Sequence, residues 1–365
     1  MAYWRLFTVS AAALLVALSL AQAEVKLVPF VAPAYTPELG FLFNAGGAMT
    51  WNGDPAHRDI PRSSLTLTAA YGTVGAFLLQ ARLVSFLEGD RTRINALIDV
   101  RDQPDHYFGV GFDNGFSRPQ GPDTTALRRT WWSADPTLLR RLAGPLYGGA
   151  VLQFSGTLAR DVSEGVAADA DYQRHGAHVV NTGMGLTLQL DTRDVPINAQ
   201  RGVFLATTWT FFGRALGATT EWHALSVDYR QYVTLFRAGS TLAWQVKYRA
   251  AFGDVPWSEM TQVGTPFDLR AYRWGQYRDR TGFTALVEFR FMLPFPSESL
   301  WSHLGFAAWG GLGALSSTVL PDFTQVLPSA GAGLRVELMR RVTLRLDAGF
   351  GRGSRAVYFN FLEAF

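Results

Sequence analysis

Apolar and polar residues alternate along many segments of this chain, each roughly ten residues long, as in transmembrane β-strands. In the segment 185–193, leucines stand at the alternate positions Leu186, Leu188 and Leu190, and polar residues follow each of them. Clusters of Gly, Pro, Asp and Asn separate the segments. Because successive side chains of a strand point to opposite sides, this pattern predicts β-strands with one apolar and one polar face.

About sixteen such segments can be counted, and bacterial single-chain membrane barrels have even strand numbers. The pattern therefore predicts an all-β fold, a transmembrane antiparallel β-barrel of about 16 strands. The predicted strands are Leu27–Ala34, Leu39–Trp51, Ser63–Gly72, Ala76–Leu87, Arg91–Arg101, Thr125–Arg140, Tyr147–Leu158, Gly176–Asp191, Gly202–Phe212, Glu221–Phe236, Thr241–Phe252, Gly282–Leu293, Leu304–Ala314, Ala330–Leu338, Val342–Phe350 and Arg355–Phe365.

The connections sort by length onto two sides if the amino terminus starts in the periplasm. Four long connections then lie on the extracellular side: 102–124, 159–175, 253–281 and 315–329. Short joins such as 88–90 and 340–341 lie on the periplasmic side. The join 52–62 is long for a periplasmic turn and does not fit this scheme.

A soluble β-sandwich could show the same alternation, so the placement of aromatic and charged residues decides between the two folds. Aromatic residues near strand ends are typical of the girdles at membrane interfaces. We interpret one group in this way: Trp131, Trp132, Trp209, Phe211 and Phe212. The polar faces mix both charge signs, as a lumen would. Both features favour the membrane barrel.

The amino-terminal residues have the pattern of a secretory signal. Arg5 precedes an apolar run over 11–20, and Ala-Gln-Ala follows at 21–23. We therefore predict a signal peptide at 1–23 and a barrel domain at 24–365. The apolar run is too short to anchor the protein as a membrane helix.

The carboxy-terminal segment alternates again and ends on an aromatic residue. A free strand edge in hydrocarbon leaves backbone groups unpaired, so we expect the last strand to pair with the first. The alternation predicts that Phe359, Phe361 and Phe365 face lipid, and that Tyr358 and Asn360 face the lumen.

Composition excludes several classes of function. Without the signal peptide, which carries Arg5, 32 basic and 30 acidic residues give a net charge of +2, whereas a nucleic-acid partner would require a basic patch. The chain has no cysteine, which excludes disulfides and thiolate metal sites. None of the six histidines lies in a nucleophile motif, and Gly-x-Ser-x-Gly is absent. We therefore expect no enzymatic activity, no cofactor and no metal.

Four stretches carry a further signal. They are the first hairpin at 28–40, an acidic-basic turn with Asp191, Arg193, Asp194 and Gly202, a loop tip of Leu269, Arg270, Ala271 and Tyr272 followed by 277–279, and the closing strands 331–365. In this order they resemble the barrel domain of the BamA/TamA-like outer-membrane assembly superfamily, also called bacterial surface antigens. The resemblance implies a multi-pass protein of the Gram-negative outer membrane, with the turn in the periplasm and the tip on the sixth extracellular loop.

The chain departs from the family pattern in several places. Its first strand begins close to Glu24, so we expect a barrel-only member without the periplasmic domains that receive client proteins. Ala271 stands where the family tip has Gly, which tolerates backbone shapes that Ala resists. The segment 306–310 lacks the acidic residue of its relatives, and Glu363 interrupts the aromatic row of the last strand.

The sixth loop is densely charged, and a wide lumen needs to be filled. If the loop folds inward, Arg270 meets polar strand faces that offer Glu288, Glu337 and Asp347. An arginine can bind a carboxylate through two parallel hydrogen bonds, so such a contact would hold the loop in the lumen. The alternative is a solvated loop charge, since exposed ion pairs contribute only about 0–1 kcal/mol.

Two functions remain open. The first, implied by the resemblance, is a barrel that assists insertion or translocation of proteins, in which a seam between the first and last strands opens to template a client strand. The second is an outer-membrane channel or surface protein without assembly activity. The expected partners are outer-membrane lipid and unfolded or secreted client proteins, with no nucleic acid, and the expected state is a monomer.

Overall fold

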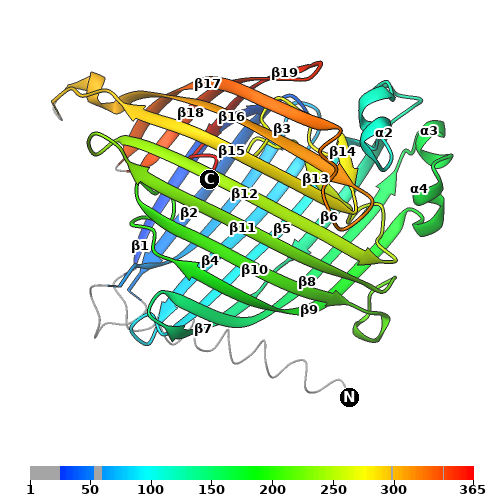
Figure 1. The fold of residues 1–365 in the computed structure, drawn as a ribbon, viewed down its shortest axis with the longest axis horizontal. Helices are drawn as coiled ribbons and strands as arrows, with labels where there is room; N and C mark the ends of the chain where they lie inside the picture. The colour runs from blue at the N-terminus through cyan, green and yellow to red at the C-terminus, as the bar shows by residue number, and fades with distance from the viewer. Residues whose placement is uncertain (1–24, 53–59, 297–298, 340) are drawn as a thin grey trace.

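Antiparallel strands curve round to form a closed barrel (Figure 1). The computed structural model describes residues 25–52, 60–296, 299–339 and 341–365, so the predicted signal peptide lies outside the described residues. The wall strands are β1 (Lys26–Thr36), β2 (Gly40–Trp51), β3 (Ser63–Gly72), β4 (Phe77–Leu87), β5 (Thr92–His106), β6 (Ala126–Ala134), β7 (Thr137–Ala143), β8 (Leu146–Arg160), β9 (His178–Asp191), β10 (Gly202–Phe212), β11 (Trp222–Thr234), β12 (Ser240–Gly253), β15 (Thr281–Met292), β16 (Leu304–Ser316), β17 (Val326–Met339), β18 (Val342–Gly351) and β19 (Ser354–Phe361). The predicted fold class is confirmed.

The sheet contains 17 strands, but the barrel has the predicted 16 strand positions. β6 and β7 share one position between β5 and β8, where the alternation predicted a single strand at 125–140. The break falls at Pro136, which has no backbone N–H to give to a ladder. Its carbonyl oxygen still accepts a hydrogen bond from Leu152 N at 3.0 Å.

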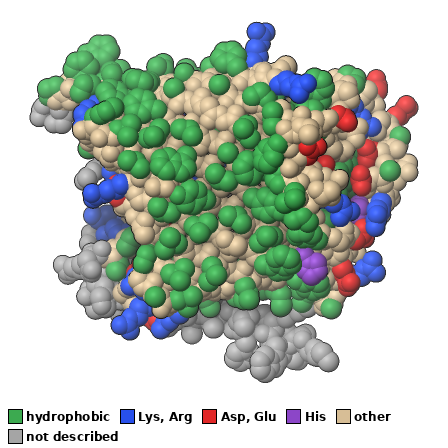
Figure 2. Space-filling view, in the orientation of Figure 1, with side chains coloured by type: hydrophobic (Ala, Val, Ile, Leu, Met, Phe, Trp, Pro, Cys, Tyr) green, Lys and Arg blue, Asp and Glu red, His purple; other side chains and the backbone are tan. Residues whose placement is uncertain are grey.

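The outer surface is apolar around the middle of the barrel. On the face shown in Figure 2, hydrophobic side chains cover the strands and charged side chains gather toward the two ends. Leu186 and Leu188 are 74% and 54% exposed, whereas Thr187 between them is 3% exposed. The predicted alternation therefore separates a lipid-facing side from a lumenal side.

The predicted aromatic girdle is only partly correct. Three of its members are exposed on the outer surface: Trp132, Trp209 and Phe211. Trp131 instead lines a lumenal cavity. Phe212 is buried and stacks on Trp222, with 3.9 Å between the ring centroids. Since adjacent strand residues point to opposite sides, a run of aromatic residues cannot all face lipid.

The long connections gather at one end of the barrel, as the scheme predicted (Figure 1). They contain α2 (Phe112–Ser117), α3 (Glu164–Ala167), α4 (Ala170–His175) and the hairpin of β13 (Thr261–Val263) and β14 (Tyr277–Asp279). The 3-10 helix η1 (Arg214–Leu216) lies in a shorter connection, between β10 and β11. Short turns and η2 (Leu300–His303) lie at the opposite end. Within the described ranges, no helix is both long and apolar enough to cross a membrane.

Two of the predicted periplasmic joins extend beyond the described residues. Arg340 of the join 340–341 and residues 53–59 of the join 52–62 lie outside them. The join 88–90 forms a tight turn in which Glu88 and Asp90 both have positive φ angles, of 52° and 64°.

The last strand ends earlier than the sequence predicts. β19 stops at Phe361, Leu362 has a φ of 62°, and the following residues turn into the barrel, where the carboxy terminus lies in Figure 1. Phe365 is only 6% exposed, so the prediction that it faces lipid is wrong. Phe359 and Phe361 lie on the opposite face of β19 from Tyr358, which is fully buried.

Candidate functional site

The sixth extracellular loop, residues 254–280 between β12 and β15, folds into the lumen. The hairpin of β13 and β14 forms its base. Its tip consists of Leu269, Arg270, Ala271 and Tyr272, and none of these is more than 1% exposed. The loop therefore occupies the lumen as predicted, and its tip packs against the wall rather than lying in solvent.

Arg270 lies between two carboxylates of the wall. Its Nη2 donates to Glu288 on β15, and its Nη1 donates to Asp347 on β18 at 3.1 Å. The guanidinium also lies 3.6 Å from the ring centroid of Trp309 on β16. Trp309 belongs to the segment 306–310, which has no acidic residue, so an aromatic face stacks on the arginine there. The second carboxylate comes from β18 instead.

Ala271 adopts a backbone conformation that favours glycine. Its φ is 145°, a region that L-residues rarely occupy. Two hydrogen bonds hold it there: its N–H donates to the Tyr358 hydroxyl at 3.3 Å, and its carbonyl oxygen accepts from the Ser354 hydroxyl at 2.5 Å. The departure from Gly at this position therefore introduces strain that contacts with β19 offset.

Glycines in the wall make room for the tip. A Cβ at Gly349 would lie 2.3 Å from the carbonyl oxygen of Arg270, and one at Gly351 would lie 2.6 Å from the Tyr272 ring. The Tyr272 hydroxyl donates to Pro328 O at 2.6 Å and accepts from Arg352 N at 2.8 Å. These close approaches attach the tip to β17, β18 and the hairpin before β19.

Three further arginines share the carboxylates that bind Arg270. Arg290 Nε donates to Glu288 at 2.6 Å, and Arg335 and Arg345 donate to Asp347 at 2.6 and 2.8 Å. All three are at most 6% exposed. Burying a charged group costs several kcal/mol of desolvation, about as much as the attraction between opposite charges returns. The network is therefore stable only while every charged group in it keeps a partner of opposite charge.

The inward-turned tail adds another carboxylate to this network. Glu363 accepts a hydrogen bond from Arg335 Nε at 3.0 Å and one from the Thr343 hydroxyl at 2.9 Å. Arg290 Nη2 donates to the backbone oxygen of Phe365 at 2.8 Å. The tail is therefore bound to two of the arginines that share the wall carboxylates of Arg270.

A second set of contacts holds the base of the loop. Arg278 donates to the carbonyl oxygens of Gly275, at 2.8 and 3.1 Å, and of Trp257, at 3.3 Å. It also lies 4.9 Å from the ring centroid of Tyr107. Burial lowers the pKa of Arg278 to about 10, so the group remains charged at neutral pH.

One predicted partner does not join the network. Glu337, expected as an alternative carboxylate for Arg270, accepts a hydrogen bond from Arg341 N at 2.6 Å near the periplasmic turn. It lies on the same strand as Arg335, β17, but close to its end. The sequence placed it on a lumenal face but could not give its height along the barrel.

The acidic-basic turn forms a compact structure at the periplasmic end. Arg193 Nε donates to Asp191 at 2.9 Å, and Gly202 has a φ of 106°, with no space for a Cβ beside Thr192 O. Although burial opposes it, the backbone hydrogen bond from Gln200 and the charge of Arg341 hold the pKa of Asp194 below its usual value. Arg341 Nη2 lies 3.0 Å from Asp194.

Sequence reasoning missed several members of the network. Trp309, Arg335, Arg345 and Glu363 were not singled out as partners of the loop tip. Arg335 and Arg345 lie opposite each other in the register of β17 and β18. The sequence signal for the network was this pair of arginines at facing positions of adjacent strands. Like charges directly opposite each other are destabilising, so such a pair indicates that carboxylates from other parts of the chain lie nearby.

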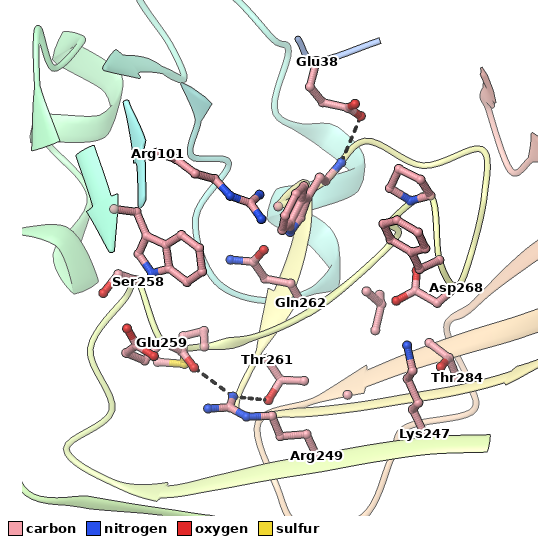
Figure 3. Close-up of a pocket in the computed structure, with 18 of the residues that line it drawn as sticks. Glu38, Arg101, Lys247, Arg249, Ser258, Glu259, Thr261, Gln262, Asp268 and Thr284 are labelled. Carbon is pink, nitrogen blue, oxygen red and sulfur yellow. Dashed lines mark hydrogen bonds between the residues drawn. The ribbon is translucent and has the colours of Figure 1, made fainter. Parts of the chain in front are cut away.

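An open cavity of about 670 Å³ remains beside the loop (Figure 3). Glu38 reaches it from the turn between β1 and β2 and accepts a hydrogen bond from Trp274 N at 3.1 Å. On the opposite side, Arg249 donates to Glu259 O and to the Thr261 hydroxyl, both at 2.9 Å. The lumen is therefore filled by the loop on the β15–β19 side and partly open on the other.

The Omp85 superfamily domain matches residues 109–361 of the chain. This range includes the sixth loop, its wall partners and all of β19. No curated protein matches the sequence.

Solved structures with the same fold include proteins of three bacteria. BamA from Haemophilus ducreyi, lacking POTRA domains 1-3, is 13% identical with a TM-score of 0.61. CdiB from Acinetobacter baumannii and CdiB from Escherichia coli are 11% and 12% identical, with TM-scores of 0.58 and 0.59. Each alignment covers 93% of this chain and 70%, 65% and 67% of the respective structures, so part of each structure has no counterpart here.

Proposed function

The chain belongs to the Omp85 superfamily, and from that premise we propose that it assists insertion or translocation of client proteins at the seam between β1 and β19. It is an integral, multi-pass β-barrel of the Gram-negative outer membrane. The clients would be unfolded or secreted proteins, and the proposed role is not enzymatic. We further propose that the mature protein, after removal of 1–23, acts as a monomer.

The observation that carries the proposal is the weakness of the seam. β1 pairs with β2 along all eleven of its residues. Among the described residues, its register with β19 comprises a single pair, Tyr35 opposite Phe359. Unpaired backbone groups on a strand edge are a template for another strand, and in lipid they cost several kcal/mol each. A client strand that pairs with this edge would satisfy them.

The sixth loop supports the proposal in a second way. Its tip is attached to β15, β17, β18 and β19, and none of the tip's hydrogen bonds described above reaches β1. The tip would therefore hold the β15–β19 side of the seam in place while the β1 side, which meets the loop through the hydrogen bond from Trp274 N to Glu38, moves. We propose that Arg270, with Glu288 and Asp347, serves this role.

A disulfide across the seam tests the proposal, because the chain has no cysteine of its own. Directly opposed residues in antiparallel strands have Cα atoms about 4.5–5.5 Å apart, within the range of a disulfide. Tyr35→Cys with Phe359→Cys, oxidised, should abolish insertion of a barrel client into proteoliposomes, and reduction should restore it.

Ala45→Cys with Ala69→Cys provides the matched control. These residues are directly opposed in β2 and β3, away from the seam. Oxidation of this pair should leave insertion unchanged. Full activity of the seam-locked protein would contradict the proposal.

The partly open lumen favours the alternative, an outer-membrane channel or surface protein without assembly activity. Planar-bilayer recordings distinguish the two functions. A steady, ion-selective current that the seam disulfide does not change would support the channel. Small, erratic openings that the disulfide suppresses would support the assembly barrel.

A further inference from the structure

Three arginines from separate loops line one small cavity at the extracellular end of the barrel. Arg118 follows α2, Arg273 lies on the sixth loop just after its tip, and Arg352 lies in the turn between β18 and β19. The cavity has a volume of about 190 Å³. Gln120, Gln276 and Ser354 also line it, so its walls are rich in hydrogen-bond donors.

The positive charge of this cavity is not balanced by its own walls. None of its lining residues is acidic. Arg118 has one carboxylate nearby, Asp169 at 3.5 Å, while in the described part of the chain no carboxylate lies within 4 Å of Arg273 or Arg352. Some other arginines of the barrel, such as Arg270 and Arg335, are paired with carboxylates.

Neighbouring groups hold two of the guanidinium groups in place. Arg352 lies 4.9 Å from the ring centroid of Phe116 on α2. Arg118 Nη2 donates to the carbonyl oxygen of Gly165 at 3.1 Å. Gln276 donates to Gly115 O at 2.9 Å, which ties the sixth loop to α2. A ligand would therefore lose little affinity to the ordering of these side chains.

We propose that this cavity, the tri-arginine pocket of Arg118, Arg273 and Arg352, binds a phosphate monoester. The planar fork of a guanidinium matches two phosphate oxygens, and a phosphate monoester carries close to two negative charges at neutral pH. That charge matches the two arginines that have no carboxylate within 4 Å in the described part of the chain, Arg273 and Arg352. At the extracellular end of an outer-membrane barrel, the phosphate comes either from the phosphorylated glycolipid of the outer leaflet or from solution.

Binding is measured first with inorganic phosphate on the folded protein in detergent, by calorimetry at constant ionic strength, with chloride as the comparison anion. Arg273→Gln and Arg352→Gln should each weaken phosphate binding by about tenfold, the effect of one charge-assisted hydrogen bond. Arg214→Gln is the matched control, because Arg214 is an exposed arginine of another extracellular loop. Heat-modifiability in gels verifies that each variant is folded.

The source of the phosphate is then tested with nanodiscs that contain phosphorylated or dephosphorylated lipid A. Protection of Arg352 from a guanidine-modifying reagent only in the phosphorylated discs identifies the glycolipid. Protection by inorganic phosphate in both kinds of disc identifies a soluble ligand. The proposal is overturned if phosphate binds no better than chloride, or if all three variants bind it equally. Because none of these readouts depends on client insertion, they remain informative if the assembly function fails its own test.

Discussion

Glu363 lies inside the barrel, 3.0 Å from Nε of Arg335, and this pair holds the end of the chain away from the seam. The register of the seam explains why. Continued antiparallel pairing from Tyr35 and Phe359 would place Glu363 opposite Val31, which is 81% exposed on the outer surface. A carboxylate there would face lipid, which destabilises a barrel. The turn at Leu362 instead directs Glu363 into the barrel, where its carboxylate binds the guanidinium of Arg335.

Glu363→Leu should therefore release the tail and let it pair with β1. In the extended register Leu362 lies opposite Ala32, so an Ala32→Cys, Leu362→Cys pair should form a disulfide in the Glu363→Leu background and not with Glu363 present. The Tyr35→Cys, Phe359→Cys pair should cross-link in both, because those residues are already opposed. Equal cross-linking of the first pair in both backgrounds would show that Glu363 does not control the tail.

Arg270→Ala should lower the free energy of unfolding by about 3–5 kcal/mol, because Glu288 and Asp347 would lose their shared cation while remaining buried. Urea titration of the folded barrel measures this loss of stability. The rate at which protease cleaves the sixth loop measures how far the loop is released from the wall. Arg280→Ala in the same loop is the control. Among the residues that the structure describes, its guanidinium donates to Gly253 O alone, at 2.9 Å, and a surface change of this kind stays within about 0.5 kcal/mol.

The charge exchange Arg270→Glu with Glu288→Arg should fail to restore stability. The new carboxylate would face Asp347 and lose the stacking on Trp309. Recovery to the stability of the unaltered protein would mean that Arg270 and Glu288 form an isolated pair rather than part of a network.

Ala271→Gly should stabilise the protein. The glycine-type φ of 145° stores strain on the order of 1–3 kcal/mol, and glycine returns about 0.5–1 kcal/mol of this as extra entropy of the unfolded chain. The expected net gain is about 1 kcal/mol in the same urea titration. A loss of stability would indicate that the Ala271 methyl group contributes packing that outweighs the strain.

Gly349→Ala should displace the tip of the sixth loop, because the added Cβ would lie 2.3 Å from Arg270 O. Gly310→Ala is the control: no atom lies within 4 Å of a Cβ at that position. We expect faster protease cleavage of the loop in the first variant and no change in the second. Identical cleavage would mean that the tip tolerates a shift of the wall.

Phe361→Arg should destabilise the barrel by about 2–4 kcal/mol if the residue lies near the middle of the membrane. Asn360→Arg should be tolerated, because Asn360 lines the open lumenal cavity. Assembly yield in the outer membrane measures both. If instead Asn360→Arg fails to assemble and Phe361→Arg assembles, Asn360 faces lipid and Phe361 faces the lumen.

Local patterns in the sequence were sufficient for the fold. The leucines at 186, 188 and 190 predicted a strand with a lipid-facing side, because side-chain direction in a strand depends only on position along the chain. The spacing of such segments predicted the strand number, and the lengths of the connections predicted the two ends of the barrel. The charge of the sixth loop, together with the resemblance, also pointed Arg270 toward Glu288 and Asp347.

Only the tertiary structure decided which residues meet across the lumen. Glu337 and Asp347 have the same chemical character and both lie on the closing strands, yet only Asp347 lies at the height of Arg270. Likewise, the alternation continued to Phe365, but the tail turned inward because Glu363 had a buried arginine to bind. The height of a side chain along the barrel depends on how neighbouring strands are staggered, and the direction of the chain after a strand depends on partners distant in sequence. The alternation of apolar and polar residues contains neither kind of information.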